Sequence, residues 1–216
     1  MLFPDKLSRY DEYTALLRAR PVETGKVLLY GSSFFTHWGV DRAAAQLAKA
    51  TGGVLQILNH GFGGSRVDDL LYRYPELVTP YHPSAIVLRT GFNDLNKGFT
   101  PEETLFLTGR LLHWLRKDYP EAPIVLLKIF DTKYGDENLA TACRAHNRLL
   151  ESLAAELPNV TVLDLNPFFY AKQEDIGCRE KLLDRFIDDG LHLTDESYEK
   201  MAEFLGPQLE NIIYNK

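Results

Sequence analysis

The feature that most constrains the fold is a series of short, almost continuous apolar runs separated by longer segments of helical pattern. The runs cover residues 27–30, 54–58, 85–88, 124–127 and 160–165 and are rich in Val, Ile and Leu. Strands that helices cover on both faces lack polar alternation because neither face meets water. Crossover helices fit between successive runs. The sequence therefore predicts an α/β protein: a three-layer α/β/α sandwich with a five-stranded parallel, flavodoxin-like doubly wound sheet.

Local signals predict several of the helices. Thr100 is followed by a proline and two glutamates, which supply an N-cap, a first-turn proline and a capping box, so a helix is expected to run to about Lys117. A further helix is predicted from an apolar stripe at helical spacing, formed by Leu139, Cys143, His146, Leu149, Leu150, Leu153 and Leu157.

The two ends of the chain are also predicted to be helical. The last helix is expected to begin after Thr194 and to be interrupted at Gly206-Pro207, because a proline cannot donate the backbone hydrogen bond that a helix needs. Residues 4–20 are expected to form an extra helix within an N-terminal extension over residues 1–25. We expect the whole chain, residues 1–216, to form a single domain, since this length is typical of one globular domain.

Composition and charge indicate which partners and which cellular compartment to expect. The net charge is −6 and no long basic run occurs, so nucleic acid is not an expected partner. No apolar run approaches the roughly 20 residues that span a bilayer, and no signal peptide is recognised, so no membrane association is expected. Cys143 and Cys178 lack CxxC spacing and are interpreted as reduced thiols of a cytoplasmic protein. The sequence leaves open whether the chain forms a homo-oligomer.

Small and polar residues follow the predicted strands at the edge where ligands bind in such sheets. Gly31-Ser32-Ser33 follows the first strand, residues 59–64 follow the second, residues 91–94 follow the third, and residues 188–192 precede the last helix. Carboxyl ends of parallel strands meet at one edge, so these four segments are expected to converge there.

These segments contain the groups that nucleophilic ester hydrolysis requires. A serine hydroxyl needs an imidazole to accept its proton and a carboxylate to orient that imidazole, and Asp189 and His192 are spaced for this task ahead of a helix. A tetrahedral intermediate also needs preorganised hydrogen-bond donors. The candidate donors are the backbone N–H groups of Ser33 and Gly64 and the side-chain amide of Asn93.

The four segments resemble the sequence blocks of the SGNH, or GDSL-like, hydrolase family, over most of the chain from about Lys26. The resemblance implies Ser33 as nucleophile, Asp189 and His192 as its triad partners, and Ser33, Gly64 and Asn93 as the oxyanion hole. It implies no cofactor, and a small-molecule substrate: short-chain acyl esters, with acetyl esters of sugars or similar molecules favoured.

One departure from the family pattern concerns the nucleophile. The usual Gly-Asp-Ser is Gly31-Ser32-Ser33 here, so a serine replaces the aspartate. Alignment through Trp38, where an aromatic residue often follows this block, places Ser33 at the nucleophile and leaves Ser32 as the alternative.

Other functions remain open at this stage. The same acyl-enzyme, captured by an alcohol, would make the chain an acyltransferase, and a non-catalytic binding module could keep the fold. A nucleotide site is disfavoured because Arg66 stands where the third glycine of GxGxxG belongs. No HExxH or comparable spacing supports a metal site.

The remaining histidines and two interior charges complete the set of candidates. His146 is expected to be a hydrogen-bonded core residue, His82 and His113 are expected on the surface, and His37 and His60 are expected near the substrate. Arg89 and Lys128 interrupt two central strands, where a charge is costly unless it is paired or faces a crevice. Each is expected to pair with a carboxylate or, alternatively, to contact a polar or acidic substrate.

Overall fold

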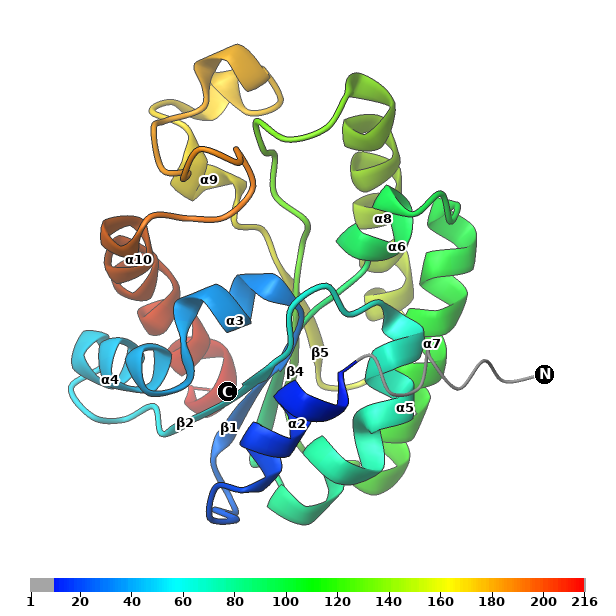
Figure 1. Cartoon of the computed structure of the whole chain (residues 1–216), viewed down its shortest axis with the longest axis vertical. Helices are drawn as coiled ribbons and strands as arrows, with labels where there is room; N and C mark the ends of the chain where they lie inside the picture. The colour runs from blue at the N-terminus through cyan, green and yellow to red at the C-terminus, as the bar shows by residue number, and fades with distance from the viewer. Residues whose placement is uncertain (1–9, 216) are drawn as a thin grey trace.

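A computed structural model describes residues 10–215, and it contains one five-stranded sheet in which neighbouring strands are parallel (Figure 1). The strand order is β2-β1-β3-β4-β5, which is the flavodoxin-like order predicted from the sequence. The strands are β1 (Val27–Gly31), β2 (Ile57–Gly61), β3 (Ala85–Arg89), β4 (Ile124–Leu127) and β5 (Val160–Leu163).

Helices cover both faces of the sheet, as Figure 1 shows. On one face lie α3 (Ser33–Trp38), α4 (Val40–Ala50) and α10 (Asp195–Tyr214). On the other lie α5 (Val67–Leu77), α7 (Pro101–Asp118) and α8 (Glu137–Ala155). The short helices α2 (Asp11–Arg18), α6 (Phe92–Asn96) and α9 (Asn166–Phe169) and the 3₁₀ turns Thr79–Tyr81, Gln173–Asp175 and Arg179–Lys181 complete the described elements.

The apolar runs are continuous because each strand supplies residues to two separate cores. Val27 and Leu29 of β1 pack in the core beneath α3, α4 and α10, whereas Leu28 and Tyr30 pack in the core beneath α5, α7 and α8. All four side chains are fully buried. The prediction of a three-layer α/β/α sandwich is therefore confirmed.

The second strand lies three residues later than predicted. Val54 is 44% exposed, and β2 instead continues through Asn59 and His60 to Gly61. These polar side chains are buried because each finds a partner: the Asn59 amide donates to the Phe35 carbonyl at 2.8 Å, and His60 Nδ1 lies 2.7 Å from the Leu77 carbonyl. Elsewhere the shifts are smaller: β1 and β3 each extend one residue further, and β5 ends two residues earlier.

The predicted interruption of the last helix is wrong, because α10 is continuous through Pro207. A proline inside a helix costs about 3 kcal/mol, but the burial of Leu205, Leu209 and Ile213 in the core offsets it. Gly206 lies where an added Cβ would come within 3.1 Å of the Ala50 Cβ, so the glycine allows α10 to approach α4 closely.

The other helix predictions fare better. The capping box at Thr100 forms with Glu103, and α7 runs to Asp118 as expected. Of the helix predicted over residues 4–20, α2 covers Asp11–Arg18, and residues 4–9 lie outside the described part of the chain. None of the helices described is both long and apolar enough to traverse a bilayer.

Candidate active site

The four predicted segments do converge at the carboxyl edge of the sheet. Ser33 is the first residue of α3, directly after β1, Gly64 lies in the loop after β2, and Asn93 lies in α6 after β3. Asp189 and His192 lie in the loop that returns over α3 before α10 begins (Figure 1). The Tyr198 hydroxyl of α10 donates to the Phe34 carbonyl at 2.8 Å, which ties this end of α10 to α3.

A small pocket opens at this edge, about 260 Å³ including its open mouth. Its walls bring the candidate nucleophile and the candidate base together. The lining residues are Ser32, Ser33, Phe34, Arg89, Phe92, Phe130, Leu191, His192 and Tyr198.

Asp189 and His192 form the closest contact of the site. Oδ2 of Asp189 lies 2.5 Å from Nδ1 of His192, and Oδ1 accepts the backbone N–H groups of Leu191 and His192 at 2.8 and 2.9 Å. Although desolvation acts in the opposite direction, these hydrogen bonds lower the pKa of Asp189 below its usual value. Asp189 is therefore held as a carboxylate that fixes one nitrogen of the imidazole.

The other nitrogen of His192 is free. The His192 side chain is 17% exposed, and Nε2 is buried without a hydrogen-bond partner among the described residues. No hydrogen bond joins Ser33 to His192, although both line the pocket. Such contacts are often long without a bound substrate.

The candidate oxyanion donors are held in place by their neighbours. The Asn93 amide donates to the Ser65 carbonyl at 2.9 Å, which leaves its second N–H unused by that bond. The Tyr10 hydroxyl donates to the Gly64 carbonyl at 2.7 Å. An added Cβ on Gly63 would lie 3.9 Å from the Ser33 Cβ, so the glycine loop lies directly against the start of α3. As the first residue of a helix, Ser33 has a backbone N–H without a partner inside that helix.

The two adjacent serines differ in exposure. Ser32 is the N-cap residue of α3 and only 4% exposed, and its carbonyl accepts the backbone N–H groups of Phe35 and Thr36. Ser33 is half-buried. Both line the pocket, and Ser33 is the more accessible of the two.

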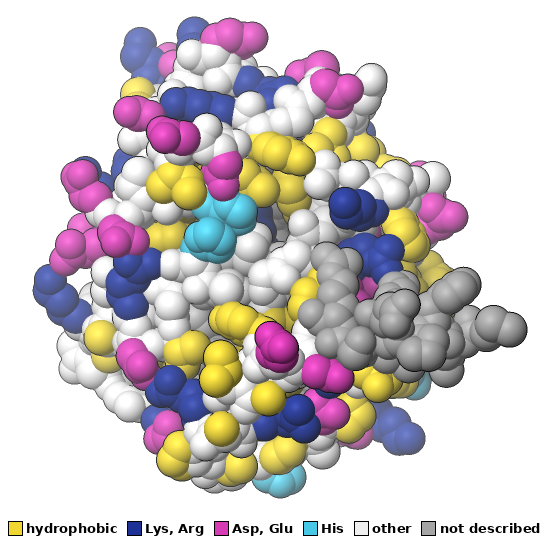
Figure 2. All heavy atoms as spheres, in the orientation of Figure 1, with side chains coloured by type: hydrophobic (Ala, Val, Ile, Leu, Met, Phe, Trp, Pro, Cys, Tyr) yellow, Lys and Arg dark blue, Asp and Glu magenta, His cyan; other side chains and the backbone are white. Residues whose placement is uncertain are grey.

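His37 lies against the candidate base. The two imidazole rings of His37 and His192 stack with centroids 3.9 Å apart and planes 13° apart. Burial, and then the proximity of His192, lower the pKa of His37. Histidine side chains gather near the middle of the face shown in Figure 2, with hydrophobic side chains beside them.

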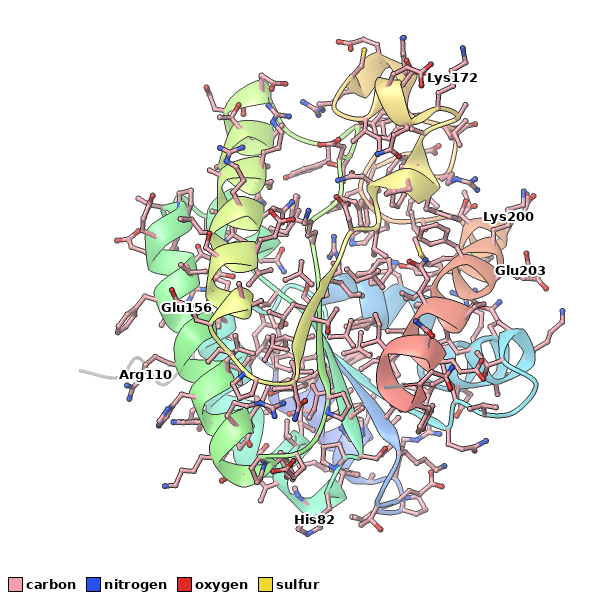
Figure 3. The ribbon with its side chains drawn as sticks, turned by 180° about the vertical axis from the view of Figure 1, so that it is seen from behind. His82, Arg110, Glu156, Lys172, Lys200 and Glu203 are labelled. Atoms are coloured by element: carbon pink, nitrogen blue, oxygen red, sulfur yellow. The ribbon has the colours of Figure 1, made fainter. Side chains whose placement is uncertain are left out.

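The other histidines lie away from the pocket. The expectation that His60 lies near the substrate is wrong. Its ring is buried against Tyr81, and its Nδ1 is hydrogen-bonded to the Leu77 carbonyl. His82 and His113 are exposed as predicted, and Figure 3 shows His82 at the end of the molecule opposite Lys172. His146 is buried in α8, with Nδ1 3.5 Å from the Pro101 carbonyl. Within residues 10–215 no group of three His, Cys, Asp or Glu side chains is arranged to hold a metal ion.

The two interior charges have different surroundings. Lys128 pairs with Glu151 and, at 3.2 Å, with Asp164, so carboxylates surround it as expected. Arg89 lines the pocket and forms no ion pair within the described part of the chain.

Sequence reasoning assigned no role to several pocket residues. Phe34, Phe92 and Leu191 are each adjacent in sequence to a predicted site residue, and this adjacency could have indicated that they line the pocket. Phe130 and Tyr198 have no such signal, because only the packing of β4 and α10 brings them to the pocket.

Comparison with known proteins identifies the family. Residues 29–200, which include all four segments, match the model of the GDSL-like lipase/acylhydrolase family. The chain belongs to this family. The expected resemblance is therefore confirmed, and the chain is an esterase of the GDSL type.

The individual relatives have low sequence identity to this chain, and a solved structure has a similar fold. The chain is 21% identical to thioesterase 1/protease 1/lysophospholipase L1 of Escherichia coli (strain K12), over 93% of this chain and 91% of that protein. It is 26% identical to the platelet-activating factor acetylhydrolase IB subunit alpha2 of Gallus gallus, over 69% of this chain and 62% of that protein. A GDSL-like lipase structure from Bacteroides thetaiotaomicron superposes with a TM-score of 0.71 and 17% identity, covering 96% of this chain and 98% of that one.

Proposed function

We propose that this GDSL-type esterase hydrolyses short-chain carboxylic esters, acetyl esters of sugars or similar small molecules among them, through a covalent acyl-enzyme on Ser33. The observation that carries the proposal is the Asp189–His192 pair. One nitrogen of the imidazole is fixed by a carboxylate at 2.5 Å, and the other has no hydrogen-bond partner among the described residues and lies in a pocket that Ser33 lines. This is the arrangement that a serine nucleophile requires of its base.

The residues divide the reaction between them. His192 Nε2 accepts the Ser33 proton as Oγ bonds to the ester carbonyl carbon, and Asp189 stabilises the imidazolium that forms. The negative charge moves to the carbonyl oxygen, where the N–H groups of Ser33 and Gly64 and the amide of Asn93 donate to it. The carbon–alkoxy bond then breaks and His192 returns the proton to the departing alcohol. Water, activated in turn by His192, hydrolyses the acyl-serine and restores the free hydroxyl.

The dimensions and lining of the pocket support a short acyl group. The volume of about 260 Å³ includes open solvent at the mouth, so the enclosed part is smaller still and leaves room for few acyl carbons. A buried arginine also lines it, which disfavours a long alkyl chain there. The relative from Gallus gallus is named an acetylhydrolase, in agreement with a small acyl group.

The experiment that tests this mechanism compares two adjacent hydroxyls. Ser33→Ala is expected to abolish hydrolysis of p-nitrophenyl acetate and covalent labelling by a fluorophosphonate, measured by mass spectrometry of the intact protein with mapping of the modified peptide. Ser32→Ala is the matched control and is expected to keep the label on Ser33. Labelling of the Ser33→Ala protein at Ser32 would reject Ser33 as the nucleophile.

A further inference from the structure

Arg89, at the carboxyl end of β3, is a buried cation without a counter-charge among residues 10–215. It is 4% exposed, and its Nε and Nη2 atoms are buried without a hydrogen-bond partner in that part of the chain. Burying a charged group in this way costs several kcal/mol unless hydrogen bonds or an opposite charge compensate. Burial lowers the pKa of Arg89 to about 10, so the guanidinium remains charged at neutral pH.

The aromatic neighbours of Arg89 stabilise the charge of its guanidinium but do not accept its hydrogen bonds. Its carbon lies 4.8 Å from the ring centroid of Phe34 and 4.4 Å from that of Phe130. Cation–π contacts of this kind act on the charge through the ring faces. They provide no acceptor for the N–H bonds, which radiate in the guanidinium plane as a fork suited to a carboxylate. The hydrogen-bonding edge of Arg89 therefore lacks the acceptor it is shaped for.

Lys128 provides a comparison: it is a charged residue beside the same sheet whose charge is balanced by ion pairs. It follows β4, the neighbour of β3, and has two carboxylates, Glu151 and Asp164, within ion-pair distance. Arg89 has no carboxylate at that distance among the described residues and instead lines the pocket together with Ser33 and His192.

We infer that Arg89 binds a carboxylate carried by the ester substrate, on either its acyl part or its alcohol part. This inference rests on the proposed esterase function and narrows its substrate class to anionic esters. A carboxylate in the pocket would place acceptor oxygens and an opposite charge beside the guanidinium, a pairing that arginine makes in a bidentate manner. A neutral alkyl group in the same place would leave the guanidinium buried and without an acceptor.

Two matched pairs of esters test the inference and locate the carboxylate. On the acyl side, mono-p-nitrophenyl succinate is compared with p-nitrophenyl 4-methylpentanoate. On the alcohol side, 4-acetoxybenzoate is compared with 4-acetoxybenzamide. In at least one pair we expect kcat/KM to favour the carboxylate by roughly 10- to 100-fold, the range for a hydrogen-bonded charged group. An equal kcat/KM for both members of both pairs would overturn the inference.

Variants assign the preference to Arg89. Arg89→Met is expected to abolish the preference for the carboxylate and Arg89→Lys to retain part of it. Lys128→Met, the matched control directly after the neighbouring strand, is expected to leave the preference unchanged. A preference that survives in Arg89→Met, with both members of a pair slowed equally, would overturn the inference. Circular dichroism confirms that each variant folds, and if Arg89→Met does not fold, the comparison of wild type with Arg89→Lys decides.

A binding measurement separates this inference from the proposed mechanism. Calorimetric titration of monomethyl succinate into the Ser33→Ala protein is expected to show binding that methyl butyrate lacks and that Ser33→Ala/Arg89→Met loses. Such binding in a protein whose wild type hydrolyses no ester would reject the esterase mechanism and keep the anion site. Hydrolysis by the wild type without carboxylate preference or binding would reject the anion site alone.

Discussion

The two halves of the candidate active site are held in different ways. Ser33, Gly64 and Asn93 follow directly from β1, β2 and β3, and the register of the parallel sheet sets their positions. Asp189 and His192 lie in a loop that is held by its own hydrogen bonds and, through the Gly190 carbonyl, by the N–H groups of Lys133 and Tyr134. In that loop the Ile187 N–H donates to the His192 carbonyl at 2.8 Å, and Asp189 accepts two backbone N–H groups.

Because of this difference, we expect substitutions in the two halves to affect folding stability and catalytic rate differently. Ser33, Gly64 and Asn93, the sheet-borne half, lie next to the buried core. Substitutions there are therefore expected to lower both the free energy of unfolding and the catalytic rate. Asp189 and His192, the loop-borne half, are only partly buried, and the hydrogen bonds that these two side chains make are local. Substitutions there are therefore expected to lower the rate and leave the fold intact.

The largest effect is expected from the loop-borne half. Asp189→Asn should lower kcat for p-nitrophenyl acetate by about 10³- to 10⁴-fold, because the imidazole loses the carboxylate that orients it and stabilises its cation. The melting temperature, followed by circular dichroism, should change by only a few degrees. A kcat within tenfold of the wild type would show that the pair does not act in catalysis.

A smaller loss is expected from the sheet-borne half. Asn93→Ala should lower kcat by about 10²- to 10³-fold, since one proposed oxyanion donor is removed, and should also reduce stability because the bond from Asn93 to the Ser65 carbonyl is lost. The control is Asn96→Ala on the same helix, an exposed position where kcat should be unchanged. Equal kcat values in the two variants would remove Asn93 from the oxyanion hole.

A purely structural change in the sheet-borne half should act on folding first. An added Cβ at Gly31 would lie 2.2 Å from the Arg89 carbonyl oxygen, so Gly31→Ala should reduce the free energy of unfolding by roughly 1–3 kcal/mol or more. In Gly109→Ala the nearest atom is 3.9 Å away in a helix, and the free energy should rise by up to about 1 kcal/mol. Urea denaturation measures both, and an unchanged value for Gly31→Ala would contradict the close packing of β1 against β3.

A further effect is expected in the pH dependence of stability, confined to the pH range in which Asp94 titrates. Burial raises the pKa of Asp94 to about 7, while its carboxylate accepts the Val67 N–H. The folded state therefore favours the protonated acid, so this contribution is fully present below about pH 4 and is lost as the pH rises through about 7. Over that window stability should fall by at most about 1.4 kcal/mol per pH unit. Asp94→Asn should flatten this decline in urea denaturation at pH 5 and pH 8, and an unchanged slope would assign the decline to other groups.

Much of the fold could be predicted because its signals are local. Continuous apolar runs gave four of the five strands to within two residues, and the cap at Thr100 set the start of α7. The second strand was misplaced because buried Asn59 and His60 look like loop residues until their distant acceptors, the Phe35 and Leu77 carbonyls, are known. Pro207 does not interrupt α10, contrary to the local prediction, because the burial that offsets its cost depends on packing against α4 and the sheet.

The sequence by itself determined the sheet type, the four segments at its carboxyl edge and the pairing of Asp189 with His192, since three-residue spacing ahead of a helix is a local property. Only the tertiary structure decided the surroundings of the interior charges. Arg89 and Lys128 look alike in the sequence, but one lines the pocket without a carboxylate and the other lies between two. The partner of a buried charge comes from elements far apart in the chain, so only the packed fold distinguishes a structural ion pair from a site for a ligand.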